Sequence, residues 1–312
     1  MTRDPAELLA AAGEGSRAAL ARLITYVESA GPSQRATIEL AYRAPSPYVV
    51  GLTGPPGAGK STLTDRLIAE ALGGELDEIG VLCVDPSSPF TGGAILGDRI
   101  RMQDHATDER VFIRSMATRG ALGGLSLAVP DALRVLGAAG FPVALVETVG
   151  VGQMEVDVAG AADTTIVVTN PGWGDAMQAN KAGLLEVADI FVINKADRPG
   201  VRETRRDLEQ MLDLGTAKDP RPPILETVAS TGEGVAELWA AILEHRRSIE
   251  GPRHAEHRRA LASAALERVL GVLWRARLAE IAEGQAYEDQ VSAIVEGRTD
   301  PYRAAETLLS SS

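Results

Sequence analysis

The sequence is poor in features that several protein classes require. It has a single cysteine, Cys83, so no disulfide can form within the chain. Because Cys83 lies inside the apolar run 81–84, we expect it to be a buried strand residue. Aromatic residues make up only 4% of the sequence. This favours helices packed on a parallel sheet over an aromatic-rich β-sandwich.

Membrane and targeting signals are also missing from the sequence pattern. No apolar run approaches the ~20 residues of a membrane span, and residues 1–5 lack the apolar core of a signal peptide. We therefore expect a cytoplasmic protein with no membrane contact. The formal net charge of -12 argues further against a general binder of nucleic acids or membrane surfaces.

The sequence does contain enough apolar residues for a sizeable core, since 45% of its 312 residues are hydrophobic. Residues 1–45 are predicted to form a helical extension, with Gly31-Pro32 as a break. Residues 46–250 alternate short apolar runs with longer helical ones, which predicts an α/β domain with a doubly wound, mostly parallel sheet. Its predicted strands are 48–53, 79–84, 111–114, 142–147, 164–169, 189–194 and 223–228. Residues 251–312 are predicted to be helical again, at 254–283, 287–295 and 301–309.

A glycine-rich loop follows the first predicted strand and opens a predicted helix. It fits the P-loop pattern completely, and this context disfavours a simple glycine turn. The loop's N–H groups can wrap phosphates, Lys60 can reach the β- and γ-phosphates, and the Ser61 hydroxyl can bind Mg²⁺. The predicted phosphate-binding residues are Gly54, Pro55, Pro56, Gly57, Ala58, Gly59, Lys60, Ser61 and Thr62.

The motif Asn194-Lys195-Ala196-Asp197, at the end of another predicted strand, indicates which base is bound. The Asp197 carboxylate can accept hydrogen bonds from guanine N1–H and the 2-amino group together, a pair of donors that adenine lacks. Asn194 would hold the loop, and the Lys195 stem would cover the ring. Residues 228–232, which include Ser230 and Thr231, are expected to add backbone amides. The nucleotide is therefore predicted to be GTP or GDP.

Residues for hydrolysis are expected between these two motifs. Glu147 ends the predicted strand 142–147 and Gly150 follows it, at the place where P-loop proteins position a carboxylate near Mg²⁺ and an N–H near the γ-phosphate. Asp85 and Asp98 are further candidates for the metal's surroundings, although each fits a cap or turn equally well. Catalytic candidates are Lys60, Glu147 and Asp98, and candidate Mg²⁺ ligands are Ser61, Asp85, Asp98 and Glu147.

The combination of GPPGAGKST, VDPSSPFTGGAILGDRIRM, RSMATRGALGGL, VETVGVGQMEVDV and NKAD resembles the MeaB/ArgK/MMAA family of P-loop GTPases over nearly the whole chain. The resemblance implies a homodimeric GTPase that chaperones an adenosylcobalamin-dependent acyl-CoA mutase, usually methylmalonyl-CoA mutase. Such proteins gate cofactor loading and protect or reactivate the mutase. The same resemblance places Asp85, Asp98 and Glu147 around Mg²⁺.

The resemblance also implies a switch loop at residues 172–181 that relays the nucleotide state to the mutase, with Asp175, Gln178 and Lys181 matching the family. Trp173 and Asn180 depart from the family's usual residues. A related partner, such as an isobutyryl-CoA or ethylmalonyl-CoA mutase, therefore stays open.

Two alternative functions are disfavoured by the residues. A metallochaperone GTPase would need a Cys/His cluster, and the sequence has one cysteine and four histidines without a clear cluster. An amino-acid-transport kinase would need ATP, against which Asp197 argues. Since no self-sufficient catalytic group is evident, we expect slow hydrolysis that a partner stimulates.

Apolar residues after position 250 exceed what one surface helix needs and predict a homodimer: Leu261, Ala264, Ala265, Val269, Leu270, Leu273, Trp274 and Leu278.

Overall fold

The computed structural model describes residues 3–29, 31–74, 76–85, 105, 107–117, 128–148, 160–172, 186–214, 221–249 and 252–310. Two compact units result, residues 1–258 and residues 259–312. None of the helices in these ranges is long and apolar enough to cross a membrane.

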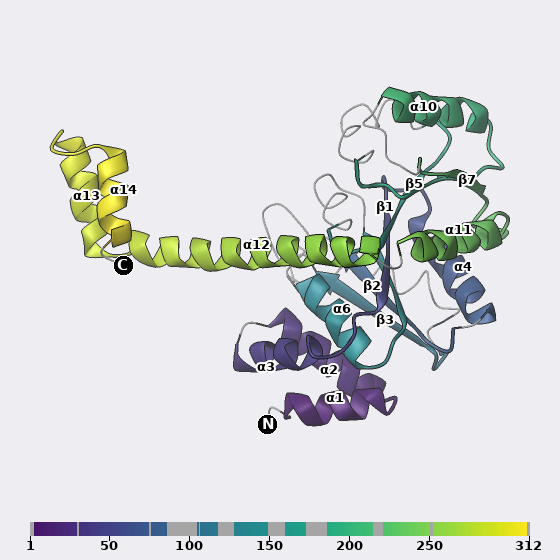
Figure 1. Cartoon of the computed structure of the whole chain (residues 1–312), viewed down its shortest axis with the longest axis horizontal. Helices are drawn as coiled ribbons and strands as arrows, with labels where there is room; N and C mark the ends of the chain where they lie inside the picture. Colours follow the sequence, from purple (N-terminus) through teal and green to yellow (C-terminus); the bar gives the residue numbers. More distant parts are fainter. Residues whose placement is uncertain are drawn as a thin grey trace. The chain divides into compact units, whose positions relative to one another are not determined.

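A seven-stranded parallel sheet forms the centre of the first unit (Figure 1). Its strands run in the order β3-β2-β4-β1-β5-β6-β7. All seven predicted strands are confirmed, as is the α/β fold class. The strands are β1 (Tyr48–Thr53), β2 (Ile79–Asp85), β3 (Val111–Ala117), β4 (Val143–Thr148), β5 (Thr164–Thr169), β6 (Ile190–Asn194) and β7 (Ile224–Thr227). Every residue of β1, β4, β5 and β6 is buried, because helices cover both faces of a parallel sheet.

Helices pack on the two faces of the sheet in separate hydrophobic clusters. Helices α4 (Lys60–Gly73) and α11 (Val235–Ser248) share one cluster with alternate residues of the strands, including Cys83, which is buried as predicted. The intervening strand residues face α6 (Ala128–Ala138) or, at β5 and β6, α10 (Val201–Leu214). This alternation holds β1, from which the following loop begins, between two packed layers.

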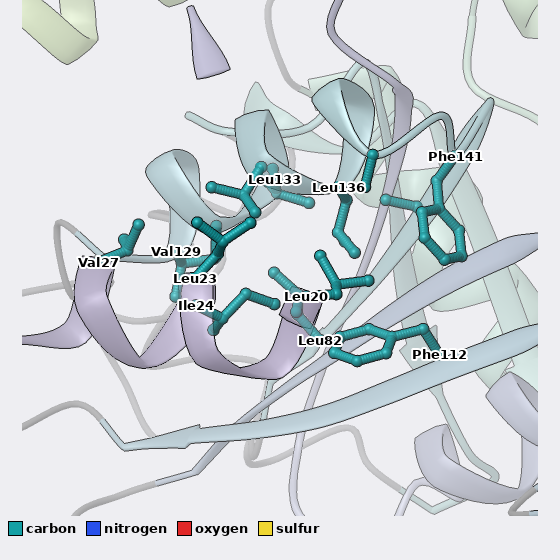
Figure 2. Close-up of a cluster of buried hydrophobic side chains, with 14 of the residues drawn as sticks. Leu20, Leu23, Ile24, Val27, Leu82, Phe112, Val129, Leu133, Leu136 and Phe141 are labelled. Carbon is teal, nitrogen blue, oxygen red and sulfur yellow. The ribbon is translucent and has the colours of Figure 1, made fainter. Parts of the chain in front are cut away.

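The N-terminal extension packs on α6 as three helices, α1 (Pro5–Gly13), α2 (Arg17–Glu28) and α3 (Pro32–Ala41). Figure 2 shows Leu20, Leu23 and Ile24 of α2 facing Val129 and Leu133 of α6. The expected break at Gly31-Pro32 is confirmed, but a second break lies between α1 and α2. There Gly15 has a φ of 94°, and the Ser16 hydroxyl accepts a hydrogen bond from the Ala19 N–H at 3.3 Å. Glycine geometry and an N-cap together start a new helix.

The remaining helices are α12 (Pro252–Ala282), α13 (Gln285–Val295) and α14 (Pro301–Ser310). These match the three helices predicted after residue 250. Helices α13 and α14 pack against each other. Helix α12 begins in the first unit and continues into the second.

Candidate functional site

The P-loop joins the end of β1 at Thr53 to the start of α4 at Lys60. Two of its glycines admit no side chain. Gly54 has a φ of 135°, and a Cβ there would lie 2.0 Å from the Val168 carbonyl oxygen. Gly59 has a φ of 92°, and a Cβ there would lie 2.4 Å from Asn194 Nδ2. The loop therefore needs glycine both for its conformation and for close approach to β5 and β6.

Lys60 and Ser61, the first two residues of α4, are both buried. Lys60 Nζ donates hydrogen bonds to the carbonyl oxygens of Gly54 at 2.7 Å and Pro55 at 2.9 Å. The ammonium group thus lies within the P-loop itself. The N-terminal turn of α4 adds its backbone N–H groups and the positive end of its dipole, an arrangement suited to an anion.

The Ser61 hydroxyl donates a 2.5 Å hydrogen bond to Glu147 Oε1. Glu147 is a buried residue of β4, and the parallel pairing of Leu52 with Glu147 brings it beside the P-loop. A hydroxyl and a carboxylate are the hard oxygen ligands that Mg²⁺ prefers. The two candidate metal-binding residues that the structure describes in full are therefore brought together, and their chemistry fits that ion.

Asn194, the last residue of β6, connects three segments of the site. Its Nδ2 donates to the Ala58 carbonyl of the P-loop at 2.8 Å. Its Oδ1 accepts hydrogen bonds from the Thr227 hydroxyl and from the Ala229 N–H, each at 3.1 Å. Since Asn194 is buried, losing any of these bonds would leave a desolvated polar group.

Lys195 has a left-handed backbone, with a φ of 60°, the one non-glycine residue with positive φ among the described ranges. Such a conformation costs on the order of 1–2 kcal/mol for an ordinary residue. Strain of this kind is characteristic of functional sites. It lets Lys195 Nζ reach back to the Gly57 carbonyl at 2.6 Å, so the lysine stem lies across the mouth of the P-loop.

These segments enclose a cavity of about 160 Å³. The predicted residues Gly59, Thr62, Asn194, Lys195, Asp197 and Ser230 all line it. Thr231 does not line it and instead supports the turn, since its N–H and its hydroxyl donate to the Val228 carbonyl at 3.0 and 3.2 Å. The cavity joins the P-loop to the Asn194-Lys195-Ala196-Asp197 motif, as a nucleotide's phosphates and base would require.

Two arginines, one lining this cavity and one contacting the loop that lines it, were not predicted. Arg198 lines it directly. Arg66 of α4 donates to the carbonyls of Ala229 and Ser230 at 3.1 and 3.4 Å. The available signal for Arg66 was its spacing, because it lies four residues after Thr62 and hence on the same face of the helix.

Several candidate residues lie outside the described ranges: Asp98, Gly150, Asp175, Gln178 and Lys181. Asp85 is the last residue of β2, and only its backbone position is described. Within the described ranges, no group of three or more His, Cys, Asp and Glu residues could hold a metal ion.

A glycine-rich loop between β1 and α4, beside a buried acid on β4, defines the class of P-loop nucleotide-binding proteins. The model of the family "Methylmalonyl Co-A mutase-associated GTPase MeaB" matches residues 20–278. The chain therefore belongs to the MeaB family, and it is a P-loop GTPase that binds guanine nucleotide.

Proteins of similar sequence or structure are consistent with membership of this family. A Pyrococcus horikoshii protein with GTPase in its name is 49% identical over 310 residues, covering 97% of this chain and 96% of that protein. "GTPase ArgK" of Escherichia coli K12 is 40% identical over 250 residues, covering 76% of this chain and 74% of that protein. The solved structure of an "LAO/AO transport system kinase" has a TM-score of 0.74 at 27% identity, covering 99% of this chain and 98% of that one.

Proposed function

We propose that this GTPase is a chaperone of an adenosylcobalamin-dependent acyl-CoA mutase, methylmalonyl-CoA mutase or a close relative. It gates loading of the mutase with its cofactor and protects or reactivates the enzyme. The family description names association with methylmalonyl-CoA mutase. A mouse protein named "Methylmalonic aciduria type A homolog, mitochondrial" is 34% identical over 256 residues, covering 76% of this chain and 61% of that protein.

The observation that carries the nucleotide part of the proposal is the shared cavity of the P-loop and the Asp197 motif. In the bound complex, the P-loop N–H groups and Lys60 would hold the phosphates, and Asp197 would accept two hydrogen bonds from guanine. Asn194 and Lys195 would hold the base against the loop. Ser230 would present its N–H to the 6-keto oxygen.

Ser61 and Glu147 would hold Mg²⁺, directly or through its waters, with Asp85 and Asp98 nearby. The ion neutralises negative charge on the transferring phosphoryl group when it is bound. Lys60 contributes a fixed positive charge from the protein itself, and Gly150 would donate its N–H at the γ-phosphate. These residues position and stabilise charge, and we expect turnover to stay slow until the mutase binds.

Two further parts belong to the proposal. The loop 172–181, with Asp175, Gln178 and Lys181, would change its contacts with the mutase as the γ-phosphate is lost, because only that group distinguishes GTP from GDP. The protein would act as a homodimer through the exposed apolar residues of α12, among them Leu270, Leu273 and Trp274.

Base recognition is tested by calorimetric titration with GDP, XDP and ADP. We expect the wild type to prefer GDP strongly, and Asp197→Asn to weaken GDP by about 2–3 kcal/mol while admitting XDP. Asp77→Asn, an exposed aspartate in another loop, is the matched control and should change nothing. Equal binding of ADP and GDP by the wild type would refute the guanine assignment.

The chaperone role is tested with purified methylmalonyl-CoA mutase. We expect the mutase to accelerate GTP turnover, and transfer of adenosylcobalamin, followed by its absorbance, to depend on GTP. Lys60→Ala should remove both effects, and Asp175→Ala should remove them while keeping GTP binding within several-fold of wild type. If neither this mutase nor the isobutyryl-CoA and ethylmalonyl-CoA enzymes alter turnover, the chaperone proposal is wrong.

A further inference from the structure

Helix α4 carries, besides the phosphate-binding Lys60 and Ser61, a half-buried arginine that contacts the opposite end of the site. Arg66 Nε donates to the Ala229 carbonyl at 3.1 Å, and its Nη2 lies 3.4 Å from the Ser230 carbonyl. One guanidinium group thus engages two successive peptide units of the loop after β7. A planar cation with several fixed donors is well suited to hold such a pair of carbonyls.

The Ala229 carbonyl belongs to the same peptide unit as the Ser230 N–H. A trans peptide is planar, and its C=O and N–H point in opposite directions. By holding the carbonyl oxygen on the α4 side, Arg66 directs the Ser230 N–H to the other side. Ser230 lines the 160 Å³ cavity together with Asp197, so the N–H directed in this way is available to a base there.

The neighbouring amides of this loop are already engaged. The N–H groups of Thr231 and Gly232 donate to the Val228 carbonyl, and those of Val228 and Ala229 donate to the Glu233 carbonyl and to Asn194 Oδ1. The Ser230 N–H has no acceptor among the described residues. It is therefore the one amide of residues 228–232 that the described part of the chain leaves for a ligand.

We propose that Arg66 is a positioning residue for base recognition: it orients and polarises the Ala229–Ser230 peptide so that the Ser230 N–H donates to the 6-keto oxygen of guanine. The inference rests on the proposed guanine recognition by Asp197. Asp197 would accept hydrogen bonds from N1–H and the 2-amino group. Arg66 would act through the backbone on the 6-keto oxygen, the third polar group on that edge of the base. A charge-assisted bond to a peptide carbonyl also strengthens the hydrogen bond made by the N–H of that unit.

The test measures binding of GDP and of 6-thioguanosine diphosphate, which keeps N1–H and the 2-amino group but replaces the keto oxygen with a weaker acceptor. We expect the wild type to prefer GDP about tenfold, the scale of one hydrogen bond of this kind. Arg66→Ala should weaken GDP about tenfold and change the affinity for the thio analogue less than about twofold. The preference for the keto oxygen should therefore nearly vanish.

Two further variants separate positioning from general damage. Arg66→Gln, which keeps one donor without the charge, should show an intermediate preference and serves if Arg66→Ala fails to fold. Arg22→Ala, an exposed arginine of α2, should keep the wild-type preference. Unfolding midpoints without nucleotide are recorded for every variant, so that a change in stability is seen separately from the ratio of affinities.

Each other outcome overturns the inference. Equal weakening of both nucleotides would show a structural role only, and unchanged affinities for both nucleotides would show no role. A wild type that binds both nucleotides equally would show that the Ser230 N–H does not read the keto oxygen. The broader proposal fails separately, because it requires only that the wild type prefer GDP to ADP.

Discussion

Helices α4 and α12 are built from similar residues but differ in what surrounds them. In α4, Leu63, Leu67 and Ile68 are completely buried against the sheet. In α12, Leu270, Leu273 and Trp274 are 55%, 52% and 55% exposed. Alanine, leucine, arginine and glutamate favour helix in both cases, so propensity alone predicts two helices. Burial separates a helix stabilised by its own unit from one whose large apolar side chains stay exposed in the single chain.

The comparison shows which apolar side chains are buried within one chain and which stay exposed. The first unit buries its strands and helices in three hydrophobic clusters formed by its own residues. Apolar residues of α12 are not in these clusters. The proposed homodimer would cover these side chains, whereas large exposed apolar side chains otherwise favour aggregation.

The largest expected effect tests the core side of this comparison. Leu67→Ala removes a fully buried side chain and should lower the free energy of unfolding of the first unit by about 3 kcal/mol, since it opens a cavity between α4 and the sheet. Urea denaturation measures it. The matched change Leu273→Ala, at a half-exposed leucine of α12, should cost the same unit less than ~0.5 kcal/mol. Equal costs would remove the distinction between the helices.

The second prediction tests the α12 side. Leu273→Glu places a charge among the exposed apolar residues and should weaken homodimerisation by about 2 kcal/mol or more, because a charge would be desolvated in the interface. Sedimentation velocity at micromolar concentration should show wild-type dimers and variant monomers, with unchanged GDP affinity. A wild-type monomer under these conditions would contradict the assembly.

A smaller effect is expected where α12 begins. Arg258 Nε lies 3.4 Å from Oδ1 of Asp163, whose side chain is 1% exposed, and Arg258 Nη2 lies 3.4 Å from the Pro47 carbonyl. Arg258→Ala should lower the free energy of unfolding by about 1–2 kcal/mol, because the buried Asp163 carboxylate loses its cation. The cost stays this small because the Arg258 side chain is itself 26% exposed. Arg259→Ala, at the exposed neighbouring position, should have almost no effect. Differential scanning calorimetry of the two variants measures the difference in stability.

The smallest effect concerns a surface turn of the first unit. Hydrogen bonds from the Arg110 side chain and backbone lower the pKa of Asp108 to about 2. Because the folded pKa is depressed, the stabilisation is present above the ordinary carboxyl range near pH 4 and is lost as pH falls through about 2. Carbon-detected NMR titration should show this pKa, and Arg110→Ala should return it towards ~4. An unchanged pKa in that variant would contradict the pairing.

Much of the fold could be predicted because buried parallel strands are apolar along their whole length. Strands β1, β4, β5 and β6 were recognisable in that way. The P-loop and the motif that holds Asp197 were recognisable by their residue patterns at strand ends. The break at Gly15-Ser16 was missed because the apolar spacing of α1 and α2 continues across it. The spacing of Arg66 from Thr62 places both on one face of α4, but it could not show the role of Arg66. The partners of Arg66 are backbone carbonyls 163 and 164 residues away, and carbonyls leave no mark in the sequence.

The hydrogen bonds of Asn194 have a consequence for inhibitor design. One side chain joins the Ala58 carbonyl of the P-loop to Thr227 and Ala229 beside the proposed base-binding residues. We therefore expect this buried contact to fix the spacing between the proposed phosphate and base subsites. Fragments for either subsite alone should bind weakly, whereas a tether of matching length gains from effective concentration. A tether that is one methylene too long should lose much of that gain, so linker length is the first variable to optimise.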